Sequence, residues 1–307
     1  MPVNKSMIKT ADLAKSFGDN VAVDRLNLEI RKGELYGLVG PDGAGKTTTM
    51  RLLAAIMDPT SGDAWVAGSS IITQGELIKE KIGYMSQRFG LYEDLTVMEN
   101  IVFYADLYDV PQKARSTRIE RLLGFSNLTP FQGRLAGKLS GGMKQKLGLA
   151  CALIHTPEVL FLDEPTNGVD PVSRRDFWKI LYDLLKEGVT ILVSTAYLDE
   201  AERCTRIGLM HKGRILIENE PKKIRNSLDI SMIEVWSDNA RSLVAPVKTI
   251  HGVTQVGLYG DRLHISLEKN TPVAGIINHL KQMDIEVKDF REILPSLEDV
   301  FIAMVEK

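Results

Sequence analysis

A glycine-rich segment, Gly40–Thr47, constrains the fold of this chain more than any other feature of its sequence. It reads GPDGAGKT and lies between a short apolar run, Glu34–Gly40, and a helical pattern over Lys46–Met57. Glycines let the backbone curl so that successive N–H groups point inward at phosphate oxygens. The helix that follows adds the positive end of its dipole at the same place. In this strand–turn–helix context the segment predicts a nucleotide-binding P-loop.

The residues of the P-loop have separate expected roles. Lys46 is expected to reach the β- and γ-phosphates of ATP and to take part in catalysis, and Thr47 is expected to bind Mg2+. The other expected ATP-binding residues of this segment are Gly40, Pro41, Asp42, Gly43, Ala44, Gly45 and Thr48. ATP and Mg2+ are thus the expected cofactors. The alternative, a chance match in a glycine-containing turn, is disfavoured by the strand and the helix on either side.

Two adjacent carboxylates, Asp163 and Glu164, follow a second buried run, Val159–Leu162. Asp163 is placed to hold Mg2+ through its hydration shell. Glu164 is placed to poise a water molecule for in-line attack on the γ-phosphate. Either acid alone could be a solvated residue at a strand end, but the P-loop in the same chain favours the catalytic interpretation.

A third motif, Leu139–Gln145, reads LSGGMKQ and resembles the signature of ABC ATPases. Together with the P-loop, the two carboxylates, Gln87 and Asp170 in the correct order, it identifies the chain as a member of the ABC nucleotide-binding domains. The resemblance covers about residues 7–218. It implies a P-loop NTPase domain of the α/β class with a helical insert.

The resemblance also implies partners and further site residues. In this family two ATPase domains dimerise head to tail around two ATP molecules, and Ser140, Gly141 and Gly142 of each signature face the ATP of the other domain. Asp170 is expected to contact ATP as well. The second ATPase domain is either another copy of this chain or a paralogue that carries a histidine at its switch. Gln87 resembles the glutamine that senses Mg2+ and the attacking water.

The resemblance extends to Phe17, which looks like the aromatic residue that stacks on adenine. An ordinary core phenylalanine is the alternative.

The organisation of the chain follows from its strand and helix patterns. A third buried run, Val189–Val193, supports a largely parallel sheet covered by helices, and a helical insert is expected at about residues 88–155. The ABC domain is expected over 1–227 and a small α+β domain over 228–307. The second domain has the order β-α-β-β-α-β, which suggests a ferredoxin-like unit. Its last helix, capped by Ser296, is strongly one-sided.

Within the ABC family, the P-loop, the signature and the ending PSLEDVF look closest to ABC-2 type exporter ATPases of the YbhF kind. Such ATPases work with separate membrane permease subunits, and Phe89–Val97 resembles the surface that receives the permease. No apolar stretch approaches the ~18 residues that a membrane span needs. We therefore expect a peripheral location at the cytoplasmic face of the inner membrane, through the permease. A net charge of −2 gives no basic footprint for nucleic acid.

Two positions depart from the family pattern. Asp42 stands where asparagine is usual and places an additional carboxylate near the phosphates. Ala196 stands in Ser194–Tyr197 where the switch histidine is expected. Because that histidine contacts the γ-phosphate, its absence is expected to weaken hydrolysis at the site built on this P-loop by roughly 10²–10³-fold.

Three functions remain open from the sequence. The preferred one is the ATPase that energises an ABC-2 exporter, as one half of an asymmetric ATPase pair. The alternative is a soluble ABC ATPase that remodels a ribosome or another assembly; such proteins usually carry two ATPase domains and basic segments. The third is a pseudo-ATPase that binds ATP only to regulate a partner, which Ala196 favours and Glu164 disfavours.

Overall fold

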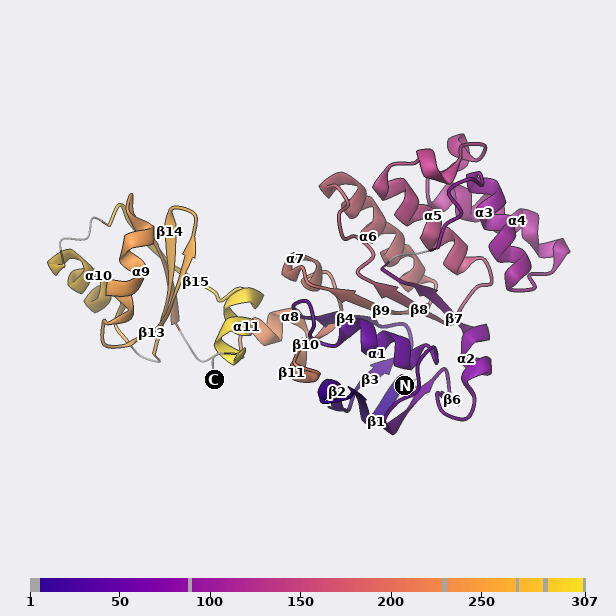
Figure 1. The fold of residues 1–307 in the computed structure, drawn as a ribbon. Coiled ribbons are helices and arrows are strands. Elements are labelled where there is room, and N and C mark those ends of the chain that lie inside the picture. Colours follow the sequence, from indigo (N-terminus) through magenta and orange to yellow (C-terminus); the bar gives the residue numbers. More distant parts are fainter. Residues whose placement is uncertain (1–5, 88–89, 228–230, 269–270, 284–286, 306–307) are drawn as a thin grey trace. The chain divides into compact units, whose positions relative to one another are not determined.

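The chain forms two compact units in a computed structural model that describes residues 6–87, 90–227, 231–268, 271–283 and 287–305. The first unit ends at Glu218 and the second begins at Asn219 (Figure 1). The expected boundary at residues 227 and 228 lies beyond this division. The short helix α8 (Pro221–Arg225) contacts the last helix, α11 (Leu297–Val305), and therefore belongs to the second unit.

The first unit contains eleven strands and seven α-helices in its described part. Its strands are β1 (Ser6–Phe17), β2 (Asn20–Leu26), β3 (Glu29–Arg31), β4 (Leu35–Val39), β5 (Ser61–Val66), β6 (Ser69–Ser70), β7 (Ile82–Met85), β8 (Val159–Asp163), β9 (Thr190–Thr195), β10 (Arg206–His211) and β11 (Arg214–Asn219). Its helices are α1 (Lys46–Leu53), α2 (Gly75–Lys81), α3 (Val97–Leu107), α4 (Gln112–Phe125), α5 (Gly141–Leu153), α6 (Pro171–Lys186) and α7 (Leu198–Ala201).

A six-stranded sheet in the order β11-β10-β4-β9-β8-β7 forms the centre of this unit. From β10 to β7 every neighbouring pair is parallel. All residues of β4, β8 and β9 are buried, which confirms the strands expected from three continuous apolar runs. Because parallel strands end at one edge, the P-loop, the two carboxylates at the end of β8 and the segment after β9 share that edge.

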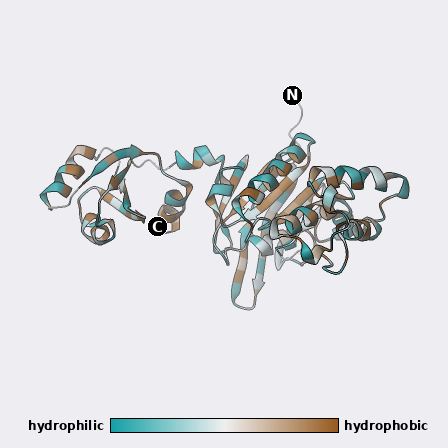
Figure 2. Ribbon diagram, turned by 90° about the horizontal axis from the view of Figure 1, so that it is seen from above, coloured by the Kyte–Doolittle hydropathy of each residue, from teal (hydrophilic) through white to brown (hydrophobic). Residues whose placement is uncertain are grey.

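A second, antiparallel sheet in the order β2-β1-β5-β6, with β3 on β1, lies beside α1 (Figure 1). Both elements share one hydrophobic core, which includes Leu13, Val23, Met50, Leu52 and Phe161. Figure 2 shows hydrophobic residues concentrated on the strands inside the unit, whereas the helices alternate hydrophobic and hydrophilic residues. The core thus fixes α1, and with it the end of the P-loop, against the central sheet.

Two expected helical features take defined forms. The helix expected to run to Met57 ends at Leu53, because Ala55 has a left-handed backbone with a φ of 51°. The expected helical insert consists of α3, α4 and α5 between β7 and β8. Thr96 and Glu99 begin α3 with reciprocal hydrogen bonds, a capping box.

The remaining elements of the second unit are β12 (Ser231–Trp236), α9 (Ala240–Lys248), β13 (Val253–Tyr259), β14 (Arg262–Leu267), α10 (Val273–Gln282) and β15 (Asp289–Ile293). The unit has the order of elements β12-α9-β13-β14-α10-β15, followed by α11; that this unit is ferredoxin-like stays a prediction. The strand order is β13-β14-β12-β15, antiparallel throughout. Ser296 caps α11 as expected, accepting from Asp299 N at 3.2 Å.

Candidate active site

Many of the expected site residues meet in one open cavity of about 530 Å3 in the first unit. It is bounded by the P-loop, the start of α1, the beginning of β2 and the segments that follow β7 and β8. Its lining residues are Phe17, Asn20, Val21, Ala22, Asp42, Gly43, Ala44, Gly45, Lys46, Thr47, Thr48, Gln87, Glu164 and Asn167. The residue expected to stack on adenine, most of the P-loop, Gln87 and Glu164 are therefore gathered around one space, whereas Gly40, Pro41 and Asp163 are not among its described lining.

The P-loop takes its shape from two glycines with left-handed backbones. The φ angle is 77° at Gly43 and 107° at Gly45, a region that residues with a Cβ rarely adopt. A Cβ on Gly45 would lie 2.3 Å from the carbonyl oxygen of Ala22, so a larger residue does not fit there. α1 begins at Lys46 directly after this turn. The amino terminus of α1 thus lies at the cavity, where it favours an anion.

Lys46 is held at the base of the cavity by three oxygen atoms. Its side chain is only 4% exposed. The ammonium donates to Gly40 O at 2.8 Å and to Pro41 O at 3.0 Å. It also forms an ion pair with Glu164 Oε1 at 3.1 Å. A buried cation is unfavourable without a counter-charge, and here the carboxylate of Glu164 provides the negative charge beside Lys46. A phosphate group of ATP would provide that charge instead.

Asp163 is almost completely buried and has one unpaired oxygen. Its Oδ1 accepts from Thr47 Oγ1 at 3.1 Å and from Ser194 Oγ at 2.7 Å. Its Oδ2 has no hydrogen-bond partner among the described residues. A buried carboxylate oxygen without a donor is unfavourable, and oxygen atoms are the ligands that Mg2+ prefers. Asp163 and Thr47 together therefore fit a magnesium ion.

Glu164 has a strained backbone that is fixed by the neighbouring strand. Its φ is 49°, which is uncommon for a residue with a side chain and is typical of functional sites. The Glu164 N–H donates to the carbonyl oxygen and to Oγ of Ser194, at 3.2 and 2.9 Å. On the carboxylate, Oε2 accepts from Gln87 Nε2 at 3.1 Å and from Asn167 Nδ2 at 3.4 Å. The expected base and the expected glutamine are thus in direct contact.

Of the two positions that depart from the family pattern, one lines this cavity. Asp42 is exposed and lines the cavity, so its carboxylate is close to the expected phosphates. Ala196 is exposed directly after β9 and is absent from the described lining. Its methyl group cannot donate a hydrogen bond. The donor expected from a switch histidine is therefore missing at that position.

The signature residues and Asp170 lie at the starts of two neighbouring helices. Ser140 caps α5 and accepts from Met143 N at 3.3 Å. A Cβ on Gly142 would lie 2.4 Å from the Cβ of Ser173 on α6, which explains the glycine. Asp170 caps α6, and its hydrogen bonds with Ser173 hold the pKa of its carboxyl below the usual range.

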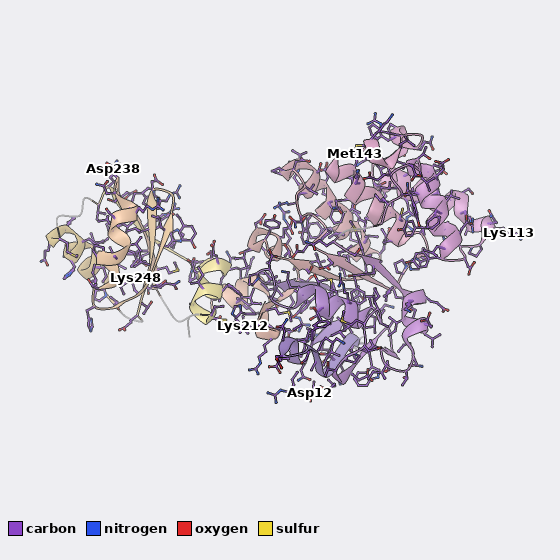
Figure 3. All side chains as sticks on the ribbon, viewed as in Figure 1. Asp12, Lys113, Met143, Lys212, Asp238 and Lys248 are labelled. Carbon is purple, nitrogen blue, oxygen red and sulfur yellow. The ribbon has the colours of Figure 1, made fainter. Side chains whose placement is uncertain are left out.

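Figure 3 labels Met143 in the first turn of α5 and Lys212 in the turn between β10 and β11, on separate sides of the first unit. Gly213, beside Lys212, donates to the P-loop residue Ala44 at 2.9 Å. Ser140, Gly141, Gly142 and Asp170 are also absent from the described lining of the cavity. The signature of this chain therefore does not meet its own P-loop.

Phe17 lies at the edge of the cavity and is not a core residue. Its side chain is 48% exposed, and the ammonium of Lys15 lies 5.2 Å from the centre of its ring. An exposed aromatic face beside a nucleotide pocket is available for stacking. That it stacks on adenine stays a prediction.

Three residues that support the site were missed by the sequence analysis: Ser194, Asn167 and Glu200. Ser194 is the last residue but one of an apolar strand, and its position near a strand end, like that of Asp163, could have marked it. Glu200 is fully buried on α7 and accepts from Thr195 Oγ1 at 2.8 Å and from Thr166. Its partners are Thr195 at the end of β9 and Thr166 in the turn after β8, so no local pattern could have revealed this role.

Comparisons with known proteins agree with the geometry. Residues 23–167 match the family described as ABC transporter, and residues 220–305 match the family described as ATP-binding protein DrrA1-3-like, C-terminal domain. The chain is 44% identical over 307 residues to the probable multidrug ABC transporter ATP-binding protein YbhF of Escherichia coli, covering 99% of this chain and 53% of YbhF. The chain thus spans about half the length of that relative.

Two further similarities cover nearly the whole of the other protein. The chain is 33% identical over 303 residues to the daunorubicin/doxorubicin resistance ATP-binding protein DrrA of Streptomyces peucetius, covering 97% of this chain and 92% of DrrA. A solved dimeric ATP-binding cassette, in a post-hydrolysis state bound to ADP and Pi, has a TM-score of 0.64 and 25% identity. That similarity covers 70% of this chain and 98% of the cassette.

The position of Glu164 leads to a test of its role. We expect Glu164→Gln to bind ATP but to lower turnover at this chain's own site by roughly 10²–10⁴-fold, because the amide cannot accept a proton from water. The two measurements are ATP affinity and single-site phosphate release. Glu220→Gln, on an exposed residue that pairs only with Lys223 in the described structure, is the matched control. Substantial turnover by Glu164→Gln would show that another group positions the water.

Proposed function

The chain belongs to the ABC transporter ATP-binding family and is an ATPase, and we propose that it energises an ABC-2 type exporter through separate membrane permease subunits. The observation that carries this proposal is the combination of the P-loop site with a DrrA-like C-terminal domain over residues 220–305. The names of two similar proteins refer to multidrug transport and to drug resistance. These relatives favour an exporter over a soluble ATPase that remodels an assembly.

The contacts of the site support a sequence of events for hydrolysis. The phosphates of ATP bind at the N–H groups of the P-loop, and the ammonium of Lys46 turns from Glu164 to the phosphates. Glu164 then accepts a proton from the water whose oxygen attacks the γ-phosphorus, while the bond to the ADP oxygen breaks. Thr47, Asp163 and Gln87 would hold Mg2+, which neutralises negative charge on the phosphates.

A complete site is proposed to need a second ATPase domain. The signature residues and Asp170 do not line the cavity of their own chain within the described residues. In a head-to-tail pair, Ser140, Gly141 and Gly142 of this chain would face the γ-phosphate of the ATP bound to the partner's P-loop. The amino terminus of α5 favours an anion at that place. Each ATP would then be bound between two chains.

We propose further that the pair is asymmetric. Ala196 offers no side-chain donor to the γ-phosphate of the site built on this P-loop. A paralogous partner with a histidine at its switch would form one complete site, using Ser140 and Gly142 of this chain. A homodimer would have two sites without the histidine.

The surface for the permease is proposed at the segment Phe89–Val97, as the family resemblance implies. Tyr92 lies in the segment expected to contact the permease; it is exposed and packs edge-on against Phe103. Residue Phe89 of that segment lies outside the described residues.

A location at the cytoplasmic face of the inner membrane follows only through such a permease. Within the described ranges, no helix combines the length and the apolar character needed to cross a bilayer. We propose no nucleic-acid partner, because the net charge of −2 provides no basic surface at the level of the whole chain.

Isolation of the native complex from membranes tests the exporter proposal. We expect integral membrane subunits to co-purify with this chain, because permeases and their ATPases form stable complexes in this family. Identification of the subunits by mass spectrometry is the measurement. Recovery of the chain only with ribosomes or another soluble assembly would contradict the proposal.

The asymmetric pair is tested by changing Lys46 and Ser140 separately in the native complex. We expect Ser140→Ala to lower the ATPase rate more than Lys46→Ala, since the signature serves the complete site and Lys46 serves the site that lacks the histidine. Lys186→Ala, on an exposed residue paired with Asp183, is the control. Equal, severe losses in a purified homodimer with brisk activity would contradict the asymmetric model.

A further inference from the structure

A chain of hydrogen bonds connects the switch segment after β9 with the carboxylate after β8. The hydroxyl of Tyr197 donates to Asn167 Oδ1 at 3.3 Å. Asn167 in turn donates from Nδ2 to Glu164 Oε2 at 3.4 Å. Tyr197 does not line the cavity in the described structure, whereas Asn167 and Glu164 do. In the described structure Tyr197 thus contacts the lining of the cavity at Asn167.

The ring of Tyr197 is fixed in place from two sides. The guanidinium of Arg174, on α6, lies 4.5 Å from the centre of the ring, a distance typical of a cation–π contact. The backbone N–H of Tyr197 donates to Thr195 Oγ1 at 3.0 Å. Arg174 and Thr195 both contact the buried carboxylate of Glu200, at 3.4 and 2.8 Å. The position of the Tyr197 hydroxyl is thus set by residues of β9, α6 and α7.

The contact from Asn167 matters most when ATP is bound. In the structure Glu164 is held by Lys46 on Oε1 and by Gln87 and Asn167 on Oε2. Once the ammonium of Lys46 turns to the phosphates, the described donors to the Glu164 carboxylate that remain are Gln87 and Asn167, both on Oε2. Asn167 can donate from Nδ2 to Glu164 only if its amide is not flipped, and a donor to Oδ1 fixes that orientation.

We propose that Tyr197 is a positioning residue for ATP hydrolysis, whose hydroxyl orients Asn167 so that its amide holds the carboxylate of Glu164 toward the attacking water. This rests on hydrolysis at the site built on this chain's own P-loop, as proposed above. Tyr197 does not replace the missing histidine, because it does not itself line the cavity in the described structure. It keeps the base in position in a site that has lost one donor to the γ-phosphate.

Removal of the hydroxyl alone tests this role. In the purified full-length chain, we expect Tyr197→Phe to lower the single-turnover rate of ATP hydrolysis about three- to ten-fold, the loss that one hydrogen bond explains. ATP affinity and the melting temperature are expected to stay unchanged, since the ring and its contact with Arg174 remain. Tyr182→Phe is the matched control: its hydroxyl donates only to Arg203 O, at 3.3 Å, in the described structure.

A double-mutant cycle separates positioning from a general structural effect. Asn167→Ser is expected to lower the rate at least as much as Tyr197→Phe, and adding Tyr197→Phe to it is expected to cause no further loss. Additive losses, an unchanged rate in Tyr197→Phe, or an equal loss in Tyr182→Phe would overturn the proposal. Any of these three outcomes overturns the role of Tyr197 alone, provided that the unchanged chain hydrolyses ATP and that Glu164→Gln abolishes this hydrolysis. A chain without any hydrolysis at its own site would overturn both that site's proposed turnover and this role.

Discussion

The buried carboxylate of Asp163 is the point on which the arrangement of the site depends. It lies at the end of β8 and accepts hydrogen bonds from Thr47 at the start of α1 and from Ser194 at the end of β9. The ends of β8 and β9 and the start of α1 are thus joined at one oxygen atom, while the second oxygen has no partner among the described residues. An unpaired buried group costs roughly 1–3 kcal/mol, or more when charged. That cost is explained if a metal ion completes the site.

This junction determines the surroundings of the catalytic base. The hydroxyl of Ser194, which donates to Asp163, also accepts a hydrogen bond from the backbone N–H of Glu164 at 2.9 Å. This bond supports the left-handed backbone conformation of Glu164. The Glu164 carboxylate then reaches Lys46 across the cavity. Binding of a nucleotide must exchange this ion pair for contacts with phosphate, so the charge of Lys46 is balanced in both states. The strain at Glu164 is stored in the protein before the substrate arrives.

Features carried by local sequence could be predicted, and features that depend on distant partners could not. The P-loop and the acids after β8 are recognisable because glycine geometry and strand ends leave a signal within a few residues. The end of α1 at Leu53 was missed because a left-handed alanine has no sequence signal. The contacts of Asn167 with Tyr197 and of Glu200 with Thr166 were missed because the two partners lie 30 and 34 residues apart in the sequence and meet only in the folded chain. The loss of a donor at Ala196 was evident from the motif, but the contacts of the following tyrosine required the structure.

Magnesium-dependent ATP binding tests the central claim most directly, namely that Asp163 joins the strand ends around a metal-dependent phosphate site. Isothermal titration of the purified chain with ATP, with and without Mg2+, should show tighter binding with the metal. In Asp163→Asn this difference should fall by about ten-fold or more, the size of one lost charge contact of about 1.4 kcal/mol. Asp183→Asn is the control, because Asp183 is exposed and forms an ion pair with Lys186. In this variant the difference in ATP affinity with and without Mg2+ should persist. Equal magnesium dependence in folded Asp163→Asn and in the unchanged chain would contradict the account.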